Sequence, residues 1–105
     1  MLQTTLTSID GAANDGFGFS VSITSNYATI GANTKNNGTI SSVGAAYIFQ
    51  RINGVWLQYQ KIVRPNGLQN EFFGNSVAID ANRFLIGARG FQSNIGMVVF
   101  GKIEN

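Results

Sequence analysis

Hydrophobic and polar residues alternate along much of this chain with the period of two that is typical of β-strands. Ser20-Val21-Ser22-Ile23 and Ser76-Val77-Ala78-Ile79 show the alternation clearly, and the other apolar segments are short and bounded by Gly or Asn. No stretch keeps a helical period. The pattern predicts an all-β fold with strands at about residues 2–7, 19–24, 27–31, 44–51, 55–63, 73–79, 83–87 and 96–103.

One hairpin is predicted from local sequence alone. Asn53-Gly54 separates an apolar segment that ends at Ile52 from another that begins at Val55. Asn and Gly readily adopt the positive φ angles that both central residues of a type I′ turn require. We therefore expect the strands at 44–51 and 55–63 to be joined by a two-residue turn.

The chain contains an internal repeat. Phe17–Ile23 returns as Phe73–Ile79, and Ile30-Gly31-Ala32 returns as Ile86-Gly87-Ala88, both at an offset of 56 residues. Between 17–32 and 73–88, nine of sixteen positions are identical. Self-similarity at a period of about 50 residues is the mark of a repeat architecture such as a propeller, whose blades have four strands each.

The boundaries of the two copies follow from the same alignment. Upstream, Leu6 pairs with Ile62 and Asp15 with Glu71; downstream, Gly44–Phe49 matches Gly96–Phe100 only after several loop residues are removed. Because loops absorb changes in length and strands do not, we interpret residues 1–105 as a single two-repeat unit. Repeat 1 covers about 8–63 and repeat 2 about 64–105.

The repeated residues resemble a known family. Phe-Gly followed by a short strand, a turn and Gly-Ala is similar to the FG-GAP repeat of integrin α-chain propellers, and Asp10–Asp15 before Phe17-Gly18 is closer still to bacterial secreted versions. The resemblance implies two four-stranded antiparallel blades of a β-propeller, a role in binding, adhesion or assembly, and an extracellular or cell-surface location.

Two departures from the family pattern limit what the resemblance implies. The proline of Gly-Ala-Pro is replaced by Asn33 in repeat 1 and by Arg89 in repeat 2. The segments 24–27 and 80–83 are too short for the Asp-rich calcium loop that many integrin-type repeats carry. Calcium binding is therefore not carried over.

The order of strands predicts assembly. Segment 2–7 aligns with 58–63, so the chain opens with the last strand of a blade and repeat 2 lacks one. Two blades cannot close a ring, since a propeller has about four to eight. We expect a homo-oligomer in which strand 2–7 of one copy is supplied in trans to the edge at 97–103 of the next. Six blades from three chains are favoured, and eight from four are possible; in a piece cut from a longer protein, the next natural blade would take that edge.

Composition excludes several classes of function. The chain has no histidine and no cysteine, which removes Ser-His-Asp and Cys-His catalysis and thiolate zinc sites. Its net charge is +2, but its seven basic residues are scattered, whereas nucleic-acid binding needs a basic stripe. No apolar run is long enough to span a membrane, and residues 1–5 lack the features of a signal peptide. We expect no cofactor and no metal.

The acidic residues are expected to be structural. Asp15 and Glu71 occupy equivalent repeat positions, where a carboxylate that caps a turn is favoured over an acid-base pair. Asp10, Asn14 and Asp15 do not match the spacing of a calcium loop. Gly16-Phe17-Gly18 is interpreted as a tight turn and not as a phosphate loop, because no helix or lysine follows it.

The apolar residues divide into a core set and a candidate binding set. The predicted core between blades consists of Phe17, Phe73, Val21, Val77, Ile23, Ile79 and Tyr47. The repeat constrains four other aromatic residues less, and a sugar ring could stack on them: Trp56, Tyr59, Phe72 and Phe91. The loop 33–42 has no counterpart in repeat 2 and is expected to be solvated.

The leading hypothesis is a non-catalytic β-propeller module for protein or matrix interaction and assembly. A carbohydrate-binding, lectin-like propeller is the first alternative. The second is an engineered or excised structural fragment that self-assembles. No catalytic residue is assigned, and no membrane or nucleic-acid partner is expected.

Overall fold

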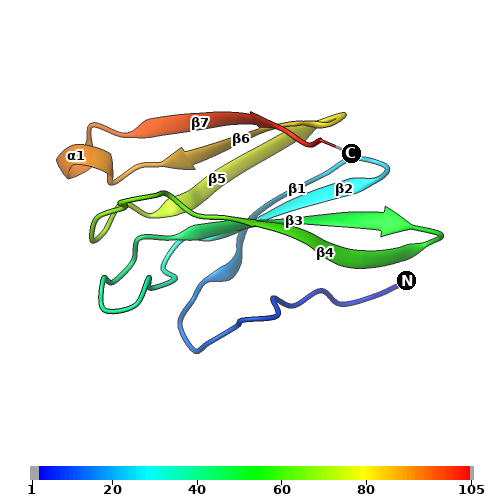
Figure 1. Cartoon of the computed structure of the whole chain (residues 1–105), viewed down its shortest axis with the longest axis horizontal. Coiled ribbons are helices and arrows are strands. Elements are labelled where there is room, and N and C mark those ends of the chain that lie inside the picture. The colour runs from blue at the N-terminus through cyan, green and yellow to red at the C-terminus, as the bar shows by residue number, and fades with distance from the viewer. Residues whose placement is uncertain (1–2, 105) are drawn as a thin grey trace.

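A computed structural model describes residues 3–104 and contains two antiparallel sheets (Figure 1). The first sheet has the order β1-β2-β3-β4, with strands β1 Phe17–Ile23, β2 Tyr27–Ala32, β3 Ala45–Ile52 and β4 Val55–Ile62. The second has the order β5-β6-β7, with strands β5 Phe73–Asp80, β6 Arg83–Ala88 and β7 Met97–Lys102. The all-β prediction is confirmed, and these seven strands lie where the sequence predicted them.

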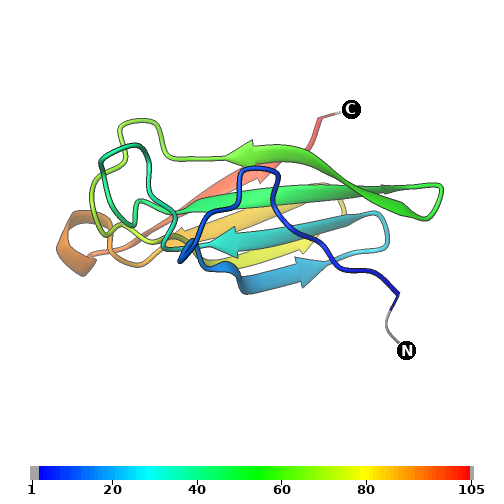
Figure 2. The same ribbon diagram turned by 90° about the horizontal axis from the view of Figure 1, so that it is seen from below.

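The predicted strand at 2–7 is wrong for the single chain. Residues 3–8 have no regular structure, and residue 2 lies outside the described part. A strand needs a neighbour to pair its N–H and C=O groups, and this segment runs instead across the outer face of the first sheet (Figures 1 and 2). Leu6 packs there against a buried cluster, so a side-chain contact replaces backbone pairing.

Two tight connections show how local sequence sets the backbone. Asn53 and Gly54 have φ angles of 52° and 79°, as the predicted type I′ turn requires. The connection from β6 to β7 carries a single turn, α1 Phe91–Asn94, in which Gln92 and Ser93 have left-handed φ angles of 49° and 55°. The repeat did not predict this turn, because it lies where repeat 2 is shorter than repeat 1.

The two sheets are stacked so that their equivalent faces point in the same direction. Ile86 of β6 lies in the buried cluster between the sheets, together with Ile48 of β3. Its repeat equivalent, Ile30 of β2, points away from the second sheet into a separate cluster with Tyr47. In a sandwich of two facing sheets both isoleucines would point inward. The front face of the second sheet therefore packs on the back face of the first.

We define these faces by their side chains, since neighbours along a strand point to opposite sides. The front face of the first sheet consists of Ala28, Ile30, Ala32, Ala45, Tyr47 and Phe49. The front face of the second sheet, Phe73, Phe84, Ile86 and Ala88, covers the back face of the first, Tyr27, Ala46 and Ile48.

The expected core is confirmed only in part. Phe73 and Tyr47 are buried, and Val77 and Ile79 pack against the cluster between the sheets. Val21 and Ile23 are instead 67% and 68% exposed. The reason is positional, because β5 has the first sheet in front of it whereas β1 has no sheet in front of it among residues 3–104.

The loop 33–42 is not simply solvated as expected. Its middle, 36–40, is exposed, but Asn33 and Lys35 are buried. The carbonyl groups of Ser41 and Ser42 accept hydrogen bonds from the N–H groups of Asn70 and Phe72, at 3.1 Å each. The end of this loop therefore helps to hold the two sheets together.

Candidate functional site

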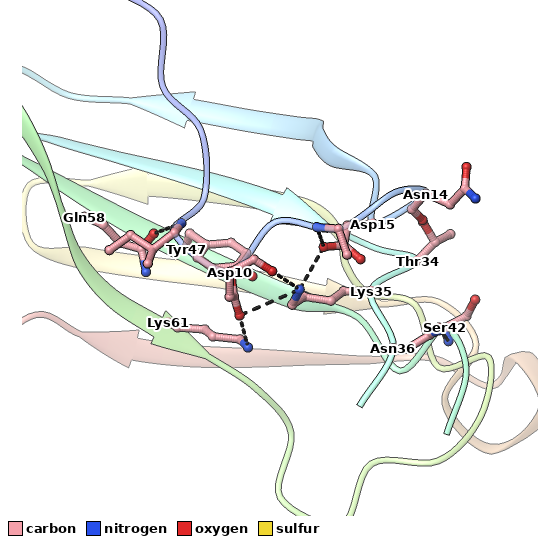
Figure 3. Close-up of polar contacts among 12 residues, drawn as sticks. Asp10, Asn14, Asp15, Thr34, Lys35, Asn36, Ser42, Tyr47, Gln58 and Lys61 are labelled. Carbon is pink, nitrogen blue, oxygen red and sulfur yellow. Dashed lines mark hydrogen bonds and ion pairs between the residues drawn. The ribbon is translucent and has the colours of Figure 1, made fainter. Parts of the chain in front are cut away.

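The segment before β1 is fastened to the first sheet by one carboxylate (Figure 3). Asp10 accepts a hydrogen bond from the hydroxyl of Tyr47 at 2.8 Å and forms an ion pair with Lys61 at 2.5 Å. Lys35 donates to the main-chain carbonyl of Asp10 at 3.0 Å, and its Nζ lies 3.7 Å from the carboxylate. These contacts join β3, β4 and the loop 33–42 to one residue.

The pKa values at this point reflect the network. Partial burial alone would raise the pKa of Asp10, but the hydrogen bonds from Lys61 and Tyr47, together with the charges of Lys61 and Lys35, lower it to about 2. Burial, followed by the hydrogen bond to Asp10, raises the pKa of Tyr47 well above its usual range. Asp10 is thus ionised and Tyr47 neutral at physiological pH.

The two equivalent acidic residues are buried, and each pairs with a basic side chain. Asp15 accepts the N–H of Ala12 at 2.9 Å, which confirms the turn-capping prediction, and also binds Lys35 Nζ at 2.7 Å. Glu71 instead accepts hydrogen bonds from Nε and Nη2 of Arg64, at 3.1 and 3.3 Å. Their exposed fractions are 8% and 2%. Each carboxylate is held by a cation and is poorly placed to act as a general acid or base.

The space between Asp10 and Asp15 already holds a cation. The Lys35 ammonium contacts both residues, the carbonyl of Asp10 at 3.0 Å and the carboxylate of Asp15 at 2.7 Å. Residues 3–104 contain no cluster of three or more acidic residues that could hold a metal. No helix in this part of the chain is long and apolar enough to cross a membrane.

The candidate aromatic residues on β4 already have partners. The Arg51 guanidinium lies 5.8 Å from the centre of the Trp56 ring, which also packs against the front-face cluster. Tyr59, 41% exposed, donates its hydroxyl hydrogen bond to the carbonyl of Glu104. The Trp56 ring therefore does not offer two free faces to a ligand.

The other two candidates lie elsewhere: Phe91 is the first residue of α1, at one end of the molecule (Figure 1), and Phe72 directly precedes β5. Arg89 stacks over Phe72 at 4.7 Å, and Arg64 stacks over Phe91 at 4.9 Å. Gly90 connects them, since its N–H binds the carbonyl of Glu71 at 2.9 Å. The structure thus brings Phe72 and Phe91 to one place but separates them from Trp56 and Tyr59.

Sequence reasoning missed an apolar surface on the back face of the second sheet. This back face consists of Leu85, Val98 and Phe100, which are 45%, 64% and 66% exposed. Two shallow apolar cavities of about 230 and 190 Å³ lie along it. The repeat alignment pairs Val98 and Phe100 with Ala46 and Ile48, but only the structure shows that Ala46 and Ile48 are buried between the sheets and that Val98 and Phe100 are exposed.

A polar hollow was also missed. It has a volume of about 500 Å³ and lies beside the turn before β1, between Asn14, Thr34 and Ser42 (Figure 3). Three of the residues that line it, Thr34, Asn36 and Ser42, belong to the loop that repeat 2 lacks, so the repeat gave no signal for it.

Comparison with known proteins bears on both sheets. The family model described as FG-GAP repeat matches residues 1–49 and again 56–97. This chain belongs to the FG-GAP repeat family. The match includes both Phe-Gly motifs, and the predicted family resemblance is confirmed. No match to the chain is found among curated proteins.

The FG-GAP motif has a visible structural role between the sheets. The second Phe-Gly pair, Phe73-Gly74, lies against the first sheet, where Phe73 forms a parallel bridge with Gly44. Ser20 Oγ donates to the carbonyl of Gly74 at 2.7 Å, and Ser22 Oγ accepts the N–H of Ile79 at 3.1 Å. The motif therefore brings the first strand of one FG-GAP repeat onto the back face of the repeat before it.

Proposed function

We propose that this FG-GAP chain is a non-catalytic interaction module that builds a β-propeller by head-to-tail association with further copies of itself. The observation that carries the proposal is the stacking of two equivalent sheets with the same face forward, front face of one on back face of the other. Such stacking leaves the front face of the first sheet and the back face of the second sheet uncovered. Because these two faces differ, each copy can add to the next in the same direction, until the rotation between copies closes a ring.

The second sheet supports the proposal because it has one strand fewer than the first. β7 pairs with β6 on one side, and no strand lies on its other side among residues 3–104. The same position in the first sheet is filled by β4. An open edge of this kind accepts a further strand readily. In the proposal, residues 2–7 of a second copy fill it.

The contacts of Leu6 are consistent with this role. Leu6 packs against the front-face cluster of the first sheet. Ile62, its repeat equivalent on β4, packs in the same way against the cluster between the sheets. The segment thus already lies where the outer strand of a preceding blade would lie, and the other three strands of that blade would come from a second copy. Three copies give six blades.

A binding function is favoured over catalysis by the chemistry present. Residues 3–104 offer buried carboxylates that are each paired with Lys or Arg, and the chain has no histidine or cysteine. A ring displaying its loops would bind a protein or matrix partner, in the extracellular or surface setting that the family suggests. A hydrolase activity lost in Asp15→Asn or Glu71→Gln would contradict this proposal.

The experiment tests the strand in trans by the mass of the protein in solution. Thr4 and Thr5 are exposed and form no strand in the single chain, so Thr4→Pro/Thr5→Pro leaves the fold intact but removes N–H groups that a new edge pairing needs. The matched control, Thr4→Val/Thr5→Val, keeps those groups and favours a strand.

We expect sedimentation or light scattering to give three times the chain mass for wild type and for the valine control, and one chain mass for the proline variant. Four times the chain mass would mean eight blades. A proline variant that retained the wild-type mass would show that residues 2–7 do not complete the second sheet.

A further inference from the structure

A stripe of apolar side chains on β1 is exposed without a cover. Phe19, Val21 and Ile23 are 61%, 67% and 68% exposed. They alternate with Ser20 and Ser22, whose hydroxyls face β5. The stripe is therefore on the front face of the first sheet, along its edge strand β1. Leu6 of the preceding segment packs against another part of that face.

The contact between the two sheets shows what such a stripe can bind. Val77 and Ile79 are the repeat equivalents of Val21 and Ile23, and they are covered because they pack against the back face of the first sheet. The Phe73-Gly74 pair beside them enters a site formed by Gly31, Gly44 and Ala45, whose backbones it touches.

The second sheet carries a vacant equivalent of that site. Gly87 and Gly96 correspond to Gly31 and Gly44, and they line a hollow of about 440 Å³ with Ser76 and Val98. A Cβ on Gly96 would meet only distant backbone atoms, whereas one on Gly44 would overlap Phe73. A Cβ on Gly18, the equivalent of Gly74, would have no atom of residues 3–104 within 4 Å apart from its chain neighbours. Both surfaces of the internal contact thus have equivalents on the outside of the chain, and in the single chain neither equivalent is in contact with the other.

We infer that the front stripe, Phe19, Val21 and Ile23, docks on the back face of the second sheet of another copy of this chain, with Phe17-Gly18 in the hollow beside Gly87 and Gly96. The inference rests on the proposed self-association and names the surfaces that form it. It continues an interface already present within the chain, which is why a second copy is the occupant rather than an unrelated protein.

The new contact would differ from the internal one at positions where the two repeats carry different residues. Inside the chain, Asn33 donates a hydrogen bond to Asn75 at 3.4 Å. The corresponding residues on the outside are Arg89, which already stacks over Phe72 of its own chain, and Phe19, so a cation beside an aromatic ring replaces an amide pair. Ser22 corresponds to Ala78, so one hydrogen bond is lost. The contact between copies is therefore more apolar than the contact within one.

A crosslinking experiment on the full chain tests this pairing. The chain has no cysteine of its own, so Phe19→Cys/Arg89→Cys carries the only thiols, and a short thiol-reactive crosslinker reports their proximity. Asn33→Cys/Asn75→Cys is the matched control, since those side chains meet within one chain. We expect the first variant to give covalent multimers that end at the ring size and the control to remain at one chain mass under denaturing conditions.

Charge substitution provides the second arm. Val21→Lys places an ammonium group on an exposed position of the stripe, so the single chain keeps its fold while docking loses affinity. Leu68→Lys is the control, because Leu68 is equally exposed, at 66%, in the loop before β5. We expect Val21→Lys to require at least a tenfold higher concentration to assemble and Leu68→Lys to assemble as wild type does.

The outcomes separate the two proposals. Wild type that remains a monomer at all concentrations would overturn both. Assembly that is lost in the threonine-to-proline variant but unchanged in Val21→Lys, with no crosslinked multimer, would overturn the docking of the stripe and leave strand addition standing. Multimers together with weakened assembly of Val21→Lys would support it.

Discussion

Gly31 and Gly74 come from different sheets, and their backbones touch. A Cβ built on Gly31 would overlap the carbonyl oxygen of Gly74, and one built on Gly74 would overlap the carbonyl oxygen of Ala45. Gly74 has a φ of 91°, which only glycine adopts easily, whereas the constraint on Gly31 is space alone. The glycines of the FG-GAP motif thus set how closely two repeats approach.

This relationship predicts different costs for one substitution at two equivalent positions. Gly31→Ala should destabilise the chain by about 3 kcal/mol or more, because backbone atoms cannot yield as a flexible side chain can. Gly87→Ala meets only Ser76 in the single chain, whose hydroxyl can rotate, so it should cost less than about 1 kcal/mol. Urea unfolding of dilute protein measures both, and equal costs would contradict the close approach of the sheets.

Asp10 predicts a pH dependence. Its pKa of about 2 in the folded chain lies below its ordinary value, so its contribution to stability is complete above about pH 5 and is lost as pH falls through 2. Since its side chain is 40% exposed, solvent screening reduces that contribution to about 1 kcal/mol.

The measurement compares Asp10→Asn with wild type. We expect the variant to be less stable at pH 7 but nearly equal at pH 2, and its amide hydrogens near Ile9, whose N–H binds Gln58, to exchange faster. A stability difference that did not change between pH 7 and pH 2 would show that the ion pairs of Asp10 do not hold the segment.

Thr29 predicts a stabilising substitution. Its side chain is fully buried between the sheets, and its hydroxyl has no hydrogen-bond partner among residues 3–104. Thr29→Val keeps the shape and removes the unsatisfied group, so we expect a gain of about 1 kcal/mol. Ser22→Ala, in the same interface, removes a hydroxyl that accepts the N–H of Ile79 and should cost about as much. Thermal unfolding of both variants checks the contrast in sign.

The repeat in the sequence was sufficient to predict most of the fold. Alternation placed Val77 on a buried face, and Asn53-Gly54 specified its turn because both residues adopt positive φ angles. The same reasoning placed Val21 in the core by analogy, which is wrong for the single chain. A repeat alignment gives equivalent positions, but burial depends on whether a neighbour is present.

The candidate site was harder to predict for a related reason. Trp56 and Phe91 were chosen because the repeat constrains them less, but Arg51, opposite Trp56 in the β3–β4 hairpin, and Arg64 each lie over one of these rings. The surface around Val98 and Gly87 is exposed, whereas the equivalent surface of the first sheet is covered by the second sheet. To find it, one must know which of two equivalent positions is covered. That information appears only when the sheets are placed in space.

Phe17 and Phe73 are equivalent in the repeat and give a final prediction about assembly. Phe73 is buried between the sheets, so Phe73→Ala should cost about 3 to 5 kcal/mol at any concentration. Phe17 is half-buried, with its ring 5.4 Å from that of Tyr47, and Phe17→Ala should cost about half as much in dilute protein.

In concentrated protein the two residues should become alike, because docking would bury Phe17 as Phe73 is buried now. We therefore expect the melting temperature of wild type to rise with concentration and that of Phe17→Ala to rise much less. The readout is scanning calorimetry over a hundredfold range of concentration. If the difference between wild type and Phe17→Ala stays constant over that range, Phe17 gains no cover from a second copy, and the docking of the β1 stripe is wrong.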